Sequence, residues 1–196
     1  MAVSAMILSG SASYCFYTYV SPVLLEKMGL DAELLTIAFI VFGIMAMISN
    51  LLSPTLSHLG GMRILWYVFL LQAIFLFALT LAMNSMILGS IVIAILGILM
   101  YLLNTPTQMY YLQISKKFYP GTLALAGSLT SSAYNVGIAL GSFSGSYSVD
   151  IAVLDSIGIT GGIFALLAMS VSYLLARKIN KEYKTVIKRA LRMSKA

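Results

Sequence analysis

The sequence predicts an all-α integral membrane protein with about six transmembrane helices. Of its 196 residues, 60% are apolar and 9% are charged, and the mean hydropathy is +0.97. A soluble domain usually carries about a quarter charged residues, so this chain has too few to cover a water-exposed surface. The apolar residues come in stretches of about twenty, the length of helix that crosses a hydrocarbon core about 30 Å thick.

Six hydrophobic stretches are separated by connections too short to hold a soluble domain. The predicted spans are Met1–Leu25, Leu34–Leu56, Ile64–Met83, Ile87–Leu112, Leu123–Val149 and Ile157–Ala176. The basic segment Arg177–Ala196 follows them, and its spacing of apolar residues predicts an amphipathic interfacial helix. The chain therefore divides into a transmembrane domain over residues 1–176 and a basic cytoplasmic tail over 177–196.

The positions of the basic residues predict the orientation of the spans. Eight of the twelve Lys and Arg residues lie in the tail, and Arg63, Lys116 and Lys117 fall in connections on the same side, which leaves Lys27 on the other. Cytoplasmic loops carry the excess of Lys and Arg, so both termini are predicted to be cytoplasmic, in the plasma or inner membrane. This placement accounts for the net charge of +6, and we expect no nucleic-acid partner.

The chain lacks the residue types that a membrane-embedded enzyme needs. It has one cysteine, Cys15, and one histidine, His58, and no charged residue falls convincingly within a span. An intramembrane protease requires a nucleophile–base pair or a metal site at membrane depth. We therefore expect no enzymatic activity, no metal and no cofactor. If transport is coupled to protons, the titrating carboxylate is expected outside this chain.

Polar residues are distributed unevenly among the predicted spans. Spans three and six are nearly pure hydrocarbon, whereas spans one, two, four and five carry many polar groups. Unpaired polar groups are costly in lipid, so spans three and six are predicted to be peripheral and the others interior. Two polar spans followed by an apolar one, and then the same again, suggest a three-plus-three inverted repeat.

Helical phase gathers polar side chains on one face of span one and one face of span four. In span four the polar residues share an arc of about 120°, and Pro106 among them predicts a kink. Amides and phenols beside a kink suit the wall of a solute cavity. The alternative, that these groups only bond neighbouring helices, remains open. The candidate substrate-binding residues are Tyr14, Thr18, Tyr101, Asn104, Gln108 and Asn135.

Span five has two distinct faces. One face carries polar residues, which are Ser128, Ser131, Ser132, Asn135, Ser142 and Ser146. The other carries Gly137, Gly141 and Gly145, a doubled GxxxG pattern. Small residues four apart let two helix backbones approach closely, so this face is predicted to be a helix-packing seam.

Several strings of residues resemble the drug/H+ antiporter branch of the major facilitator superfamily. Tyr17–Leu30, YTYVSPVLLEKMGL, resembles its seventh helix and following loop, and Pro106–Met109 with Ser128–Gly141 looks like its tenth and eleventh helices. The nearest subgroup is the sugar and purine-nucleoside exporters of the arabinose-efflux-permease type. In the cytoplasmic turn, Ser57 and His58 stand where the family has Asp and Arg, so a charge lock is not expected there.

The resemblance implies that the six spans are helices seven to twelve, the C-terminal half of a twelve-helix transporter. It implies efflux of a small solute such as a sugar, nucleoside or drug by solute/H+ antiport, with spans one and four lining the cavity. A lone half supplies one cavity wall, so we expect it to need an N-terminal six-helix half or a second copy. The sequence starts almost inside a helix, which favours a truncated product. A non-transporting remnant or half-subunit scaffold is the alternative.

Overall fold

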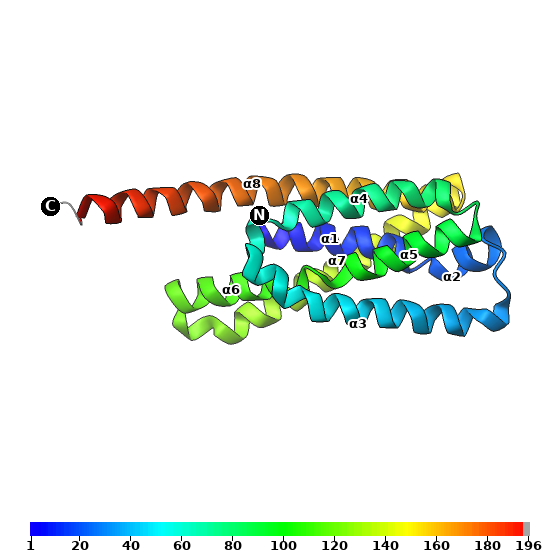
Figure 1. The fold of residues 1–196 in the computed structure, drawn as a ribbon, viewed down its shortest axis with the longest axis horizontal. Coiled ribbons are helices and arrows are strands. Elements are labelled where there is room, and N and C mark those ends of the chain that lie inside the picture. Colours follow the sequence, from blue (N-terminus) through cyan, green and yellow to red (C-terminus); the bar gives the residue numbers. More distant parts are fainter. Residues whose placement is uncertain (194–196) are drawn as a thin grey trace.

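The computed structural model describes residues 1–193, and all their side chains except those of 117, 118, 120 and 182–193. It is a bundle of helices that run along one long axis, with no strand among the described residues (Figure 1). The N-terminus and the end of the last helix lie toward the same end of the bundle (Figure 1).

The helices follow the predicted hydrophobic stretches, with different ends. They are α1 (Ala2–Tyr17), α2 (Val20–Pro22), a π-helical turn (Val23–Lys27), α3 (Leu35–Leu59), α4 (Leu65–Ala82), α5 (Met86–Tyr101), α6 (Asn104–Phe118), α7 (Leu123–Ala152) and α8 (Ser156–Met193). Five helical stretches, starting at Ala32, Leu65, Met86, Leu123 and Ser156, are long and apolar enough to cross a membrane. The prediction of a multi-pass helical protein is therefore confirmed.

The first predicted span, Met1–Leu25, is not one continuous helix. Its longest piece, α1, has 16 residues, and the chain turns at Thr18 and Tyr19 before α2 begins. Pro22 explains the position of the break, because a proline offers no N–H to the carbonyl four residues earlier and its ring crowds that carbonyl. The prediction of a span over Met1–Leu25 did not include this break.

The last predicted boundary, between Ala176 and Arg177, is not a break in the backbone. Helix α8 runs without interruption from Ser156 to Met193. Most of the apolar stripe predicted for the tail lies at residues 183–191, whose side chains are outside the described residues. The amphipathic tail therefore stays a prediction.

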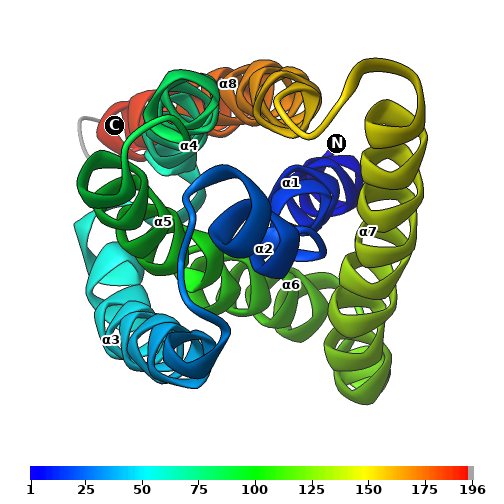
Figure 2. The ribbon, with the colours of Figure 1, turned by 90° about the vertical axis from the view of Figure 1, so that its right-hand side faces the viewer.

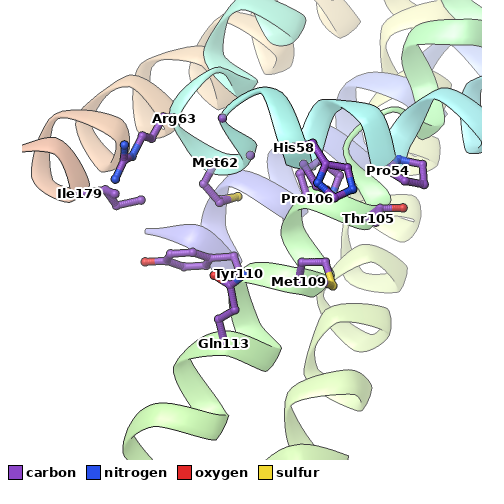
Figure 3. A pocket seen from close by; sticks show the side chains of 13 residues that line it. Pro54, His58, Met62, Arg63, Thr105, Pro106, Met109, Tyr110, Gln113 and Ile179 are labelled. Atoms are coloured by element: carbon purple, nitrogen blue, oxygen red, sulfur yellow. The ribbon is translucent and has the colours of Figure 1, made fainter. Parts of the chain in front are cut away.

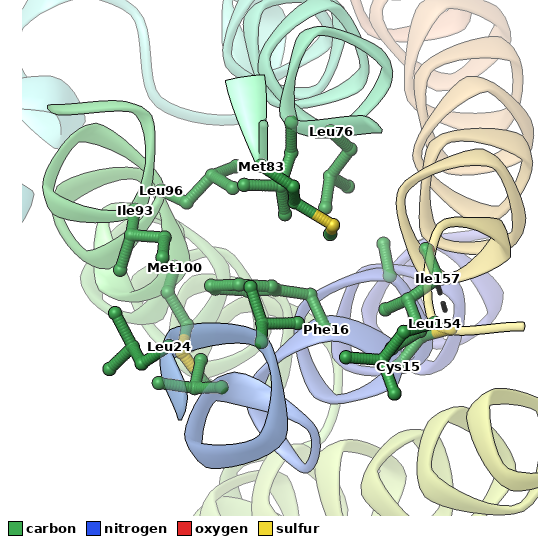
Figure 4. Close-up of a cluster of buried hydrophobic side chains, with 14 of the residues drawn as sticks. Cys15, Phe16, Leu24, Leu76, Met83, Ile93, Leu96, Met100, Leu154 and Ile157 are labelled. Carbon is green, nitrogen blue, oxygen red and sulfur yellow. Dashed lines mark hydrogen bonds between the residues drawn. The ribbon is translucent and has the colours of Figure 1, made fainter. Parts of the chain in front are cut away.

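Helix α1 lies in the middle of the bundle, against α7 and α8 (Figure 2). Helices α4 and α8 pack together on one side, α6 lies on the opposite side, and α3 and α7 flank it. Side chains from α1, α4, α5 and the start of α8 form the main apolar core; ten of them are labelled in Figure 4: Cys15, Phe16, Leu24, Leu76, Met83, Ile93, Leu96, Met100, Leu154 and Ile157.

Burial within this chain differs among the helices that the sequence divides into peripheral and interior spans. Helices α4 and α8 each bury 39% of their membrane-length residues, whereas α3 buries 11% and α7 17%. The apolar side chains of α4 and α8 pack on each other and on α1, while α3 turns its serines inward and its apolar face outward. Spans two and five are thus the most exposed of these helices within this chain, and the division of the complete protein into peripheral and interior spans stays a prediction.

One buried hydrogen bond ties α4 to α1. Gln72 Nε2 donates to Ser13 Oγ over 3.0 Å, both side chains are buried, and the Gln72 carbonyl oxygen has no partner among the described residues. Ser13→Ala should lower the free energy of unfolding by about 1 kcal/mol, because it leaves the amide unpaired. The double variant Ser13→Ala/Gln72→Leu should recover most of that loss in thermal melting. A double variant that melts lower than Ser13→Ala would contradict this.

Candidate functional site

A row of aromatic rings crosses the bundle from α7 through α1 to α3. Tyr134 and Tyr14 meet edge to face with ring centroids 6.0 Å apart, and Tyr14 meets Tyr17 at 5.5 Å. Tyr17 then lies 5.2 Å from Phe42 of α3. Tyr14 and Tyr17 are three residues apart and so share one face of α1. We call Tyr134, Tyr14, Tyr17 and Phe42 the aromatic row.

A fourth phenol joins the aromatic row from the end of α5. The Tyr101 side chain lies near those of Tyr14 and Tyr134. Tyr14 and Tyr101 are half-buried, and the buried Tyr134 hydroxyl has no hydrogen-bond partner among the described residues. Phenols both donate and accept hydrogen bonds, so three converging hydroxyls can bind a polar solute beside apolar ring faces.

Thr18 lies at the break after α1 and connects it to α7. Its hydroxyl donates to the Tyr14 carbonyl over 2.8 Å and lies 2.9 Å from the Ser142 hydroxyl. Thr18 is one helical turn from Tyr14 and is exposed. The structure therefore brings three of the predicted site residues, Tyr14, Thr18 and Tyr101, into one region.

The amides of the fourth span lie at a second break. Helix α5 ends at Tyr101 and α6 begins at Asn104, next to the predicted kink at Pro106. Asn104 Nδ2 lies 3.5 Å from Asn50 Oδ1 of α3, which is a weak hydrogen bond. Gln108, one turn further, is exposed. No hydrogen bond among the described side chains joins Gln108 or Asn135 to the aromatic row.

The glycines of α7 face α1 at close range. A Cβ atom on Gly137 would lie 3.0 Å from Gly10 Cα, and one on Gly141 would lie 2.8 Å from Ser11 Cα. One on Gly145 would lie 2.9 Å from the Cys15 carbonyl oxygen. Side chains at these positions would collide with backbone, which cannot rotate away.

The sequence prediction missed two contributors from α7. Tyr134 belongs to the aromatic row although the prediction selected its exposed neighbour, Asn135. Tyr134 lies three residues before Gly137, so it shares the glycine face that packs on α1, and this spacing was the available signal. Ser142 was counted on the polar face without a partner, because spacing within one helix does not reveal which neighbour it meets.

A separate cavity lies apart from the aromatic row. Its volume is about 620 Å³, and it opens between the end of α3, the turn after it, α6 and α8 (Figure 3). His58, Arg63 and Gln113 give it some polar lining, while Thr105 and Pro106 connect it to the α5–α6 break. Among the described residues, no three His, Cys, Asp or Glu side chains come together as a metal site would require.

Two curated relatives resemble most of this chain. An uncharacterised MFS-type transporter of Bacillus subtilis, YtbD, is 32% identical over 147 residues, which are 75% of this chain and 36% of the relative. A probable sugar efflux transporter of Helicobacter pylori is 26% identical over 164 residues, which are 84% of this chain and 40% of the relative. The chain thus spans well under half the length of either. No protein-family model and no solved structure matches it.

The two relatives bear on the expected class of protein. Both are named as transporters, in agreement with the expectation that this chain is not an enzyme. Together with the long apolar helices, they make the chain a multi-pass membrane protein.

Proposed function

Because this chain belongs to the major facilitator superfamily, we propose that it is the C-terminal half of an efflux transporter and forms one wall of a solute pathway. The observation that carries the proposal is the group of hydroxyls and amides on spans one, four and five. The aromatic row, Tyr101 and Thr18 converge in one region, and Asn104 and Gln108 lie along the continuing helix.

A wall of this kind needs a covering partner. Gln108 and Asn135 are exposed on membrane-length helices and Thr18 is exposed at the break after α1, and lipid tails offer no hydrogen bonds to such groups. The sparsely buried helices α3 and α7 flank this side of the bundle (Figure 2). A second set of helices that covers it, an N-terminal half or a second copy, would satisfy the polar groups and close the pathway.

The packing of the helices supports a three-plus-three inverted repeat. If spans one to three are exchanged with spans four to six, α1 corresponds to α5 and α6, α3 corresponds to α7, and α4 corresponds to α8. The contact between α1 and α7 then corresponds to the contact of α5 and α6 with α3. Under the same exchange the contact between α1 and α8 corresponds to the contact between α5 and α4, and the contact between α4 and α8 corresponds to itself. The break after α1 and the break between α5 and α6 are each bonded by a serine from corresponding helices. Ser142 of α7 bonds Thr18, and Ser53 of α3 bonds the Leu102 carbonyl. Such repeats let one half rock against the other in alternating access.

The solute that fits these groups is a small uncharged molecule with hydroxyl or amide groups. Phenols, amides and hydroxyls bind sugars and nucleosides by hydrogen bonds, and the rings add apolar contact. The name of the Helicobacter pylori relative favours a sugar. Antiport with protons would require a carboxylate from the covering half, since the six acidic residues here fall in the predicted connections between spans and in the tail. The basic residues favour a plasma or inner membrane location with cytoplasmic termini.

Efflux from vesicles tests the proposal. The chain is reconstituted alone and together with the part of the Bacillus subtilis relative that it does not match, and export of labelled sugars and purine nucleosides is measured. Export that requires both components supports a transporter half. Export by the chain alone would instead favour a homodimer. No export by either preparation, with the protein folded and inserted, would favour a non-transporting scaffold.

A further inference from the structure

The break between α5 and α6 leaves backbone groups that the helix itself cannot pair. Pro106 has no N–H, so the Leu102 carbonyl loses the hydrogen bond it would accept in a continuous helix. The regular pattern resumes where the Thr107 N–H donates to the Leu103 carbonyl over 3.1 Å. Leu103, Pro106 and Thr107 are buried, so water is not at hand to replace the lost bond.

A side chain from α3 bonds to both sides of this break. Ser53 Oγ donates to the Leu102 carbonyl over 2.8 Å and accepts from the Thr105 N–H over 3.0 Å. One hydroxyl therefore pairs two backbone groups that precede Pro106, the Leu102 carbonyl and the Thr105 N–H. Ser53 is fully buried, which fixes both bonds in a dry environment where leaving either group unpaired is costly.

The neighbouring serines of α3 show that this role is specific to Ser53. Ser49, one turn earlier, also bonds a carbonyl, that of Ile98, but among the described residues no backbone N–H donates to it. The hydroxyl of Ser57, one turn later, is buried and has no partner among the described residues. All three lie in one row along α3, so Ser57 provides a matched control for Ser53.

We propose that Ser53 is a positioning residue for solute binding: it holds the α5–α6 break in the geometry that presents Asn104 and Gln108 to the solute pathway. The inference rests on the proposed function, because Asn104 begins α6 and immediately precedes the Thr105 N–H that Ser53 holds. Loss of the hydroxyl frees the backbone on both sides of Asn104, at the start of the helix that also carries Gln108. Asn104 is also the α6 residue whose side chain reaches α3, at Asn50.

Hydrogen exchange in the reconstituted full chain tests the bond without any need for transport. Ser53→Ala should speed exchange of the Thr105 amide roughly tenfold, because that N–H loses its acceptor. Ser57→Ala should leave this rate unchanged. Equal exchange in wild type and Ser53→Ala, or an equal effect of Ser57→Ala, would overturn the proposal.

A double-variant cycle separates positioning from general loss of packing. Pro106→Ala restores an N–H that can bond the Leu102 carbonyl and removes the ring that interrupts the helix, so a continuous helix can offer the Tyr101 carbonyl to the Thr105 N–H. Ser53→Ala should then matter less for the exchange rate of the Thr105 amide in that background. In a preparation that exports solute, Ser53→Ala should raise KM several-fold at an unchanged amount of inserted protein. Equal effects in both backgrounds, or an unchanged KM with faster exchange, would overturn the positioning role. Absence of export by the wild type would count against the proposed function, while the exchange results would still decide whether Ser53 holds the break.

Discussion

Replacing Gly141 with leucine should separate α1 from α7 and greatly destabilise the protein. A Cβ atom at this position would lie 2.8 Å from Ser11 Cα and 3.0 Å from the Cys15 backbone nitrogen. Both are backbone atoms of α1, so the only relief is to move one helix away from the other. Overpacking of this kind typically costs about 1–3 kcal/mol, and a leucine against a backbone should lie at the upper end or beyond.

The matched control is a second glycine of the same helix. A Cβ atom on Gly127 would meet nothing within 4 Å, so Gly127→Leu should be tolerated. Thermal melting of the purified chain, followed by size-exclusion chromatography, should show a large loss for Gly141→Leu and little change for Gly127→Leu. Equal melting temperatures for the two variants would contradict a close helix contact at Gly141.

Proline positions show how much of the fold the sequence could predict. Pro106 predicted a kink, and the structure has a break four residues before it, between Tyr101 and Asn104. The same rule applied to Pro22 places a break near Thr18, which the structure shows and the prediction of a span over Met1–Leu25 did not include. The backbone consequence of proline is local and can therefore be predicted from sequence. The length of α8 beyond Ala176 could not, because charged and apolar residues are both compatible with a helix there.

The candidate site was only partly predictable, for a related reason. Helical phase correctly groups Tyr14 with Thr18 on one helix, but the meeting of Tyr14 with Tyr134 depends on how α1 and α7 pack. Ser53 shows the same limit. Its importance arises from two backbone groups on a helix about fifty residues away, and no spacing within α3 indicates them.

Truncating the amides of α6 should impair transport while leaving the fold intact. In a preparation that exports solute, Asn104→Ala or Gln108→Ala should raise KM about tenfold, since one lost hydrogen bond to a solute costs about 1–1.5 kcal/mol. Gln108 is exposed, and the only hydrogen bond of the Asn104 side chain among the described residues is the weak one to Asn50, so neither truncation removes a strong contact of the fold. The measurement is efflux at several solute concentrations, normalised to the amount of protein in the membrane.

Asn84→Ala provides the control, because Asn84 is an exposed amide in the connection between α4 and α5. Its KM should equal that of the wild type.

The outcomes distinguish the two interpretations of the polar face. A raised KM with normal insertion means that the amides contact solute, because a packing role alone would lower the amount of folded protein first. Reduced insertion or melting without a change in KM would mean that they serve only to bond neighbouring helices. A variant with unchanged KM and unchanged insertion would show that the substituted amide, Asn104 or Gln108, does not line the solute pathway. The aromatic row would then be the remaining wall of that pathway.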